Sequence, residues 1–153
     1  MNSDFNIAVH ALVYLSHKAQ TLSSEALAEN ICTNPARVRK VLASLGKAGL
    51  VSTREGRPHG GYAIARPAGD ITLKEVSLAM DACFVSTAWK SGDPNMTCLV
   101  ASGMAGLMDE IYGRLDQQCK NTLGQITIRD LEERIFRPAP DKPAQEAAER
   151  NPV

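Results

Sequence analysis

Basic side chains gather on one face of a predicted helix over residues 35–48. Apolar residues repeat there at helical spacing, which predicts a buried face: Val38, Val41, Leu42 and Leu45. The remaining surface carries hydroxyl and cationic groups: Arg37, Arg39, Lys40, Ser44 and Lys47. Guanidinium and ammonium groups on a helix can bind the phosphates of a nucleic acid. The alternative is a solvated basic face without a ligand.

The residues that flank this helix carry start and stop signals. Asn34 is a favoured N-cap, Pro35 suits the first helical position, and Gly49 suits the C-terminal end. A strand, a glycine-rich turn and a second strand are predicted next, over residues 50–65. Candidate DNA contacts at the helix start and in this hairpin are Asn34, Arg54, Arg57, His59, Gly60 and Gly61.

Two predicted helices come before the basic one. The first carries an apolar stripe at helical spacing, formed by Phe5, Val9, Leu12 and Val13. A second, short helix can be capped by Ser23 or Ser24. Three helices followed by a hairpin give the order of a winged helix-turn-helix, whose third helix enters the major groove of double-stranded DNA.

Charge is unevenly distributed along the chain, although its formal net charge is zero. Residues 1–66 hold 8 Lys and Arg against 4 Asp and Glu, whereas residues 67–153 hold 9 against 13. The split is either chance or a basic half directed at nucleic acid. No apolar run reaches the ~20 residues of a membrane helix, so we expect a cytoplasmic protein without a membrane partner. Catalytic motifs are also missing from the sequence, and we expect no enzyme activity.

A long helix is predicted after a polar loop over residues 86–96. The Thr72–Glu75 segment is a capping box that opens a fourth helix, and Thr97 is expected to cap the long helix from about Cys98 to Lys120. An apolar stripe follows the long helix: Val100, Met104, Leu107, Met108, Ile111 and Leu115. This stripe either packs within the chain or forms the seam of a homodimer.

The sequence therefore predicts a mainly α fold with a small β wing. We expect a winged helix-turn-helix domain at residues 1–83, and the loop, dimerisation helix and final short helix at residues 84–136. Thr127 is expected to cap that last helix, Ile128–Ile135. The remainder, residues 137–153, is rich in Pro, Ala, Glu and Lys and is predicted to be disordered.

Four widely spaced cysteines form no Cys-x-x-Cys motif, and we expect them to be thiols. Cys98 lies beside the predicted cap of the long helix, where the helix dipole lowers a thiol pKa and favours the reactive thiolate. It is therefore a redox-sensing candidate, and the alternative is an inert small apolar residue. We expect Cys32, Cys83 and Cys119 to fill the core.

Five motifs together resemble the Rrf2 family of bacterial winged-helix regulators, over about residues 2–135. They are Thr33-Asn34-Pro35, residues 45–51, Gly60-Gly61-Tyr62, residues 70–73 and Cys98. The resemblance implies a transcriptional regulator, most simply a repressor, that binds a palindromic operator as a homodimer joined through the long helix.

One departure from the family pattern concerns cofactors. Cluster-binding members of the family place three cysteines in the loop before the dimer helix, and Cys98 is the only one that this sequence offers there. The sequence is more similar to the branch with a solitary cysteine, so we expect no cofactor and no metal site. An iron–sulfur cluster with unusual ligands stays open, with Asp4, Asn6 and His10 as candidates. A protein-interaction module that has lost operator binding is a further alternative.

Overall fold

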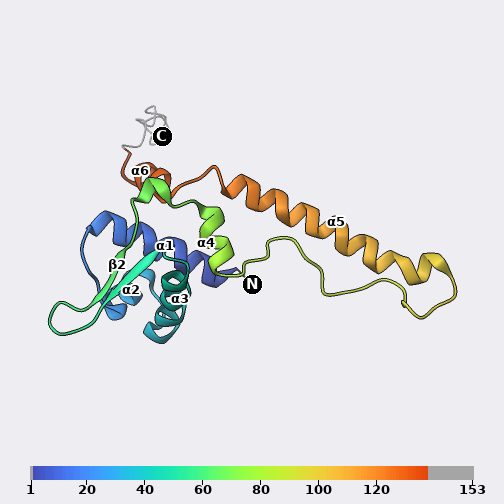
Figure 1. The fold of residues 1–153 in the computed structure, drawn as a ribbon, viewed down its shortest axis with the longest axis horizontal. Coiled ribbons are helices and arrows are strands. Elements are labelled where there is room, and N and C mark those ends of the chain that lie inside the picture. Colours follow the sequence, from blue (N-terminus) through green and yellow to red (C-terminus); the bar gives the residue numbers. More distant parts are fainter. Residues whose placement is uncertain (1, 138–153) are drawn as a thin grey trace, which may run out of the picture.

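The computed structural model describes residues 2–137, and the predicted disordered tail lies almost entirely outside them. Figure 1 shows a head built around α1 to α4, from which α5 extends to one side. The elements are α1 Ser3–Lys18, α2 Ser24–Ile31, α3 Pro35–Lys47, β1 Val51–Arg54, β2 Gly61–Ile64, the 3-10 helix η1 Ala68–Asp70, α4 Leu73–Ala79, α5 Leu99–Leu123 and α6 Ile128–Phe136. The predicted fold class, mainly α with a small β wing, is confirmed.

The buried faces of α1, α2 and α3, together with apolar residues of α4 and α6, form the core of the head. Its largest fully buried apolar side chains are Leu12, Leu15, Leu27, Leu42, Leu45, Leu50, Ile71, Ile128, Val38, Val41 and Val76. Burying one such side chain contributes about 1.5–3 kcal/mol. The apolar face predicted for residues 35–48 is therefore confirmed, and its burial fixes which side of α3 faces solvent.

The ends of α3 follow from local hydrogen bonds. The Asn34 side chain accepts the backbone N–H of Ala36 at 2.7 Å. At the other end, Gly49 adopts a positive φ of 73°. The N–H of Leu50 donates to the carbonyl of Leu45 at 3.0 Å, which satisfies a carbonyl that the helix end would otherwise leave unpaired.

The wing is a two-stranded antiparallel sheet with an additional bridge. Its register runs from Val51 opposite Ile64 to Arg54 opposite Gly61. Leu22, in the turn between α1 and α2, also pairs with Tyr62: each backbone N–H donates to the other's carbonyl, at 2.9 and 2.8 Å. The sequence did not predict this bridge, which ties β2 to the turn between the first two helices.

The expected capping box begins α4 at Thr72, and Thr127 caps α6 as predicted, in a second capping box that the sequence did not predict. These two threonines also pair in an isolated β-bridge. The N–H of Ile128 donates to Ile71 at 3.0 Å, next to the same bridge. The segment that follows α5 therefore returns to the head and docks α6 there.

The prediction is wrong at the two ends of α5 and for the cysteines expected in the core. Cys98, not Thr97, is the N-cap of α5, which extends to Leu123 because helical backbone bonding continues past Lys120. Cys32 is exposed because it follows the last residue of α2, where the chain turns with a φ of 59°. Cys83 is exposed in the loop after α4, and the third expected core cysteine, Cys119, is only partly buried.

None of the helices within residues 2–137 is both long and apolar enough to cross a membrane.

Candidate nucleic-acid interface

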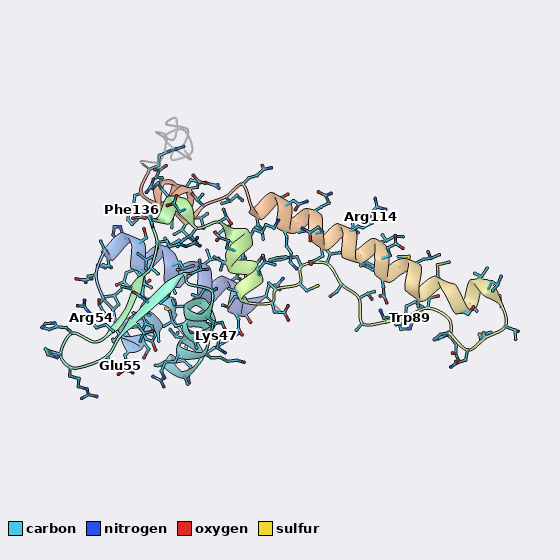
Figure 2. The ribbon with its side chains drawn as sticks, viewed as in Figure 1. Lys47, Arg54, Glu55, Trp89, Arg114 and Phe136 are labelled. Carbon is cyan, nitrogen blue, oxygen red and sulfur yellow. The ribbon has the colours of Figure 1, made fainter. Side chains whose placement is uncertain are left out.

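The solvent face of α3 and the wing carry most of the predicted contact residues. Arg37, Arg39, Lys40 and Lys47 are exposed, and Ser44 is partly buried. In the wing, Arg54, Arg57 and His59 are exposed. Figure 2 shows Lys47 and Arg54 in the head, well away from the loop that holds Trp89 beside α5. The structure thus places cations on α3 and on the wing of the same head.

Arg37 is bound by the first turn of α1. Its Nε and Nη2 donate to the Asp4 carboxylate at 2.9 and 2.7 Å, and Nη2 also donates to the hydroxyl of Ser3. The sequence pointed to Asp4 only as a candidate cluster ligand and did not indicate this pair. Its partners are 33 residues apart and have no local signature.

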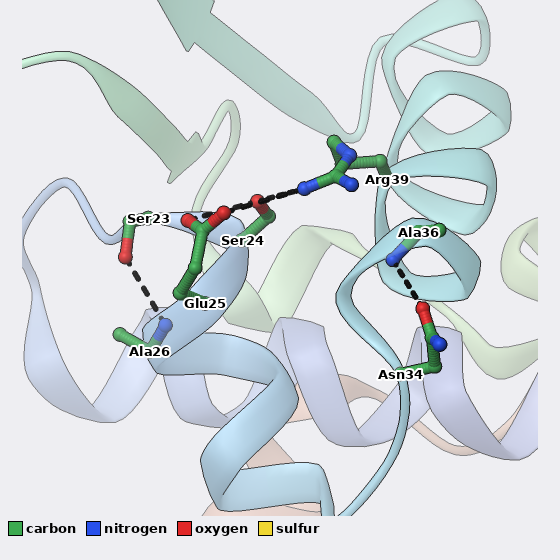
Figure 3. Close-up of polar contacts among 7 residues, drawn as sticks. All are labelled: Ser23, Ser24, Glu25, Ala26, Asn34, Ala36 and Arg39. Carbon is green, nitrogen blue, oxygen red and sulfur yellow. Dashed lines mark hydrogen bonds and ion pairs between the residues drawn. The ribbon is translucent and has the colours of Figure 1, made fainter.

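Arg39 is bound more loosely, by the start of α2 (Figure 3). Its Nη1 donates to the Ser24 hydroxyl at 3.2 Å and to Glu25 at 3.3 Å. The backbone N–H of Glu25 and the Ser24 hydroxyl lower the pKa of the Glu25 carboxyl. Among residues 2–137, Lys40 and Lys47 have no ion-pair partner, so they are the α3 cations with uncompensated charge.

Asn34, Gly60 and Gly61 have structural roles that explain their residue types. The Asn34 side-chain oxygen caps α3 (Figure 3). A Cβ at Gly60 would lie 2.2 Å from the carbonyl oxygen of Gly56, and one at Gly61 would lie 2.4 Å from that of Leu22. The two glycines let the turn of the wing close and let the start of β2 approach Leu22.

The apolar stripe of α5 is mostly exposed. Val100 is 67% exposed, Leu107 58%, Leu115 48%, Ile111 46% and Met104 37%. Met108 differs, because it is partly buried and lines a small hollow between α5 and the preceding loop, together with Trp89. Packing within the described chain therefore covers one side of α5 and leaves this stripe open to solvent.

α5 is anchored to the head near its C-terminal end. The Asp116 carboxylate accepts the N–H groups of Phe84 and Val85 at 2.6 and 3.2 Å, and pairs with Lys120 at 2.8 Å. Hydrogen bonding from Lys120, then from the Phe84 N–H, lowers the Asp116 pKa to about 2. The ring of Phe84 packs edge-on against Phe5 of α1, with centroids 5.2 Å apart.

Cys98 is exposed at the opposite end of α5. The backbone N–H groups of Ala101 and Val100 lower the pKa of its thiol, as expected at a helix N-terminus. The preceding loop is tied to the same turn, since the N–H of Asp93 donates to the carbonyl of Ala101 at 3.0 Å. A Cβ at Gly92 would lie only 2.0 Å from that carbonyl oxygen, so the loop can lie there because residue 92 is glycine.

The histidines of α1 border an open groove of about 950 Å³ on the head. His10 shares a hydrogen bond with the Asn30 side chain at 2.8 Å. His17 lies 3.6 Å from Glu132 and stacks on Phe136 of α6. Each of these rings thus has a neighbour within its own head.

The fold and the exposed basic helix define a winged helix-turn-helix regulator of transcription. A family model described as Rrf2, iron-dependent transcriptional regulator, matches residues 1–134. The chain therefore belongs to the Rrf2 family, whose members regulate transcription and are not enzymes.

Individual relatives agree with this assignment. The candidate HTH-type transcriptional regulator YwnA of Bacillus subtilis is 29% identical over 136 residues, which is 89% of this chain and 99% of YwnA. The crystal structure of a candidate transcriptional regulator from Lactobacillus plantarum matches with a TM-score of 0.74 at 24% identity, covering 88% of this chain and 91% of that one. The structure of CymR, the global cysteine regulator of B. subtilis, matches with a TM-score of 0.63 at 17% identity, over 88% and 96% of the two chains.

The family description mentions iron, but the possible iron ligands in the described part of this chain do not lie close enough together to bind it. Within residues 2–137, no three His, Cys, Asp or Glu side chains are grouped as a metal site. Cys83 is far from Cys98. It lies next to Phe84, whose backbone N–H donates to Asp116. Asp116 lies 18 residues after Cys98 along α5. At ~1.5 Å per residue, about 27 Å separates these two positions on the helix. Asp4 and His10 lie on α1 in the head, far from the start of α5 (Figure 1).

Proposed function

We propose that this chain is a cytoplasmic homodimeric repressor that binds a palindromic site in double-stranded DNA. The observation that carries the proposal is the exposed basic surface of α3, backed by the fully buried Val38, Val41, Leu42 and Leu45. Core packing holds this surface outward, so α3 can enter a major groove while Arg54 and Arg57 of the wing lie along the phosphates. A dimer bound across a promoter excludes polymerase, which gives repression.

The exposed stripe of α5 supports the homodimer. Five apolar side chains along one face of a 25-residue helix are costly to leave in water. A second copy of α5 offers the same stripe, and two-fold pairing buries both. The two α3 helices then face half-sites about one helical turn of DNA apart, roughly 34 Å, and the operator repeats as a palindrome.

Cys98 is the proposed site of the inducing signal. Its thiol is exposed and its pKa is lowered, which favours the thiolate. A thiolate attacks a peroxide oxygen, the O–O bond breaks, and the products are a sulfenic acid and water or an alcohol. The added oxygen lies at the start of the dimer helix, next to the loop held by Asp93, and changes the packing at the seam.

Selection from a randomised duplex library tests the DNA proposal. Purified protein, prepared without oxygen, is incubated with random 30-base-pair duplexes, and bound DNA is sequenced after several rounds. We expect a palindromic consensus, and footprinting should protect two half-sites on one face of the duplex. Failure to enrich any sequence, with a folded dimer, would contradict operator binding and favour a protein-interaction module on the same fold.

A further inference from the structure

The contact between α1 and α3 distinguishes Arg37 from the other cations of the interface. Arg37 is the third residue of α3, just after the Asn34 cap and Pro35. The N-terminal residues of a recognition helix are those that contact base edges. Its guanidinium is held there by two bonds to Asp4 and one to Ser3, whereas Lys40 and Lys47 have no ion-pair partner within residues 2–137.

The Asp4 carboxylate changes what Arg37 can recognise. The pair has no net charge, so it attracts a phosphate much less than a free cation does. Nε and Nη2 are occupied, and the two N–H groups on Nη1 have no acceptor in the described part of the chain. An oriented donor edge without net charge suits the N7 and O6 acceptors of guanine, which are dipolar rather than anionic.

We propose that Asp4 is a positioning residue for base recognition: with Ser3, it holds the Arg37 guanidinium so that Nη1 meets a guanine edge in the major groove. The inference rests on the proposed DNA-binding function and assigns a task within it. Lys40 and Lys47 supply affinity through phosphates, and the Asp4–Arg37 pair supplies sequence discrimination. Ordering of the side chain by a carboxylate reduces the conformational entropy lost on binding.

A double-mutant cycle tests the proposal with two DNA probes. One probe is the duplex that the parent selects from the random library, and the other is a scrambled duplex of equal length. Arg37→Ala should lower the ratio of their affinities about tenfold, and Asp4→Ala about three- to tenfold. In the Arg37→Ala background, Asp4→Ala should leave the ratio unchanged, because its effect passes through Arg37.

Glu25→Ala is the matched control. It also removes one exposed carboxylate bound to an arginine of α3, but Glu25 contacts Arg39 through a single 3.3 Å bond. Loss of a negative charge should tighten binding to both probes in parallel and keep their ratio. If the ratio of the two affinities falls in Asp4→Ala but not in Glu25→Ala, the cause is the orientation of the Arg37 guanidinium and not the loss of a negative charge.

The salt dependence of binding gives a second readout. Arg37→Ala should change the slope of log affinity against log salt by much less than Lys40→Ala, which should reduce it by roughly 1. An unchanged or raised ratio in Asp4→Ala, or a full unit of slope lost in Arg37→Ala, would overturn the proposal. If Asp4→Ala does not fold, Asp4→Asn and Arg37→Lys carry the same comparison. A parent that selects no sequence would instead refute the proposed function.

Discussion

The Asp116 carboxylate of α5 accepts a hydrogen bond from the backbone N–H of Phe84 at 2.6 Å, although the two residues are 32 positions apart in the sequence. This bond fixes the loop after α4 to the long helix. The same carboxylate pairs with Lys120, which itself has a raised pKa because it bonds Asp116. The junction of head and long helix therefore depends on the charge of one aspartate.

We expect this junction to weaken in acid. The folded-state pKa of Asp116, about 2, lies below its ordinary value of 3.8. The ionised Asp116 carboxylate therefore stabilises the folded protein fully above about pH 4, and this contribution is lost as the pH falls through about 2. Asp116→Asn should lower the free energy of unfolding by about 1–3 kcal/mol at pH 6. Urea unfolding from pH 6 to pH 2.5 measures this, and the gap between the two proteins should narrow at low pH. A gap of constant size would contradict it.

Two of the phosphate contacts should be made by the unpaired cations of α3, in addition to those of the wing. Lys40→Ala with Lys47→Ala should weaken binding to selected and scrambled duplexes alike, and reduce the salt slope by roughly 2 in total. Fluorescence anisotropy between 50 and 300 mM salt measures the slope. Lys18→Ala, which removes an exposed cation at the end of α1, is the control and should keep the parental slope. Equal affinities for the parent and the double variant at every salt concentration would show that another surface binds DNA.

A single charge introduced into the proposed dimer seam of α5 should dissociate the homodimer. Ile111→Glu places a carboxylate in the middle of the exposed stripe and should dissociate the dimer, because burying an unpaired charge costs several kcal/mol. Sedimentation velocity measures the change. Gln117→Glu adds the same charge to another face of α5 and should stay dimeric. A monomeric parent, or an Ile111→Glu dimer, would exclude the proposed seam.

Oxidant sensitivity should depend on Cys98. Brief treatment with a mild peroxide should lower operator affinity in the parent and leave Cys98→Ser unaffected. Cys32→Ser removes another exposed thiol and should respond as the parent does. Mass spectrometry should place a single added oxygen on the peptide that contains Cys98. Equal loss of binding in Cys98→Ser, or visible absorbance of an iron–sulfur cluster in anaerobic protein, would contradict the thiol switch.

The sequence predicted the features that depend only on residues close together in the chain. Asn34 and Thr72 cap their helices because each side chain bonds a backbone N–H two or three residues away. The basic face of α3 follows from helical spacing alone. These features required no knowledge of distant parts of the chain.

Contacts between distant segments could not be predicted in this way. The Asp4–Arg37 pair and the Leu22–Tyr62 bridge join residues that meet only after the head has folded. Cys32 was expected in the core because cysteine is usually buried, but its place at the end of α2 exposes it. Position in the fold overrode the average behaviour of the residue type.

The attachment of α5 near one end has a mechanical consequence. From Asp116 back to Leu99 the helix spans 17 residues, or about 26 Å at ~1.5 Å per residue. It acts as a lever whose pivot is the Asp116–Phe84 bond, so a rotation of 5° at the pivot moves the Cys98 end by roughly 2 Å. The Phe84 ring contacts Phe5, and the residue before it, Asp4, holds Arg37. Small movements at the Cys98 end of α5 are thus connected, through two adjacent residues of α1, to the first turn of α3.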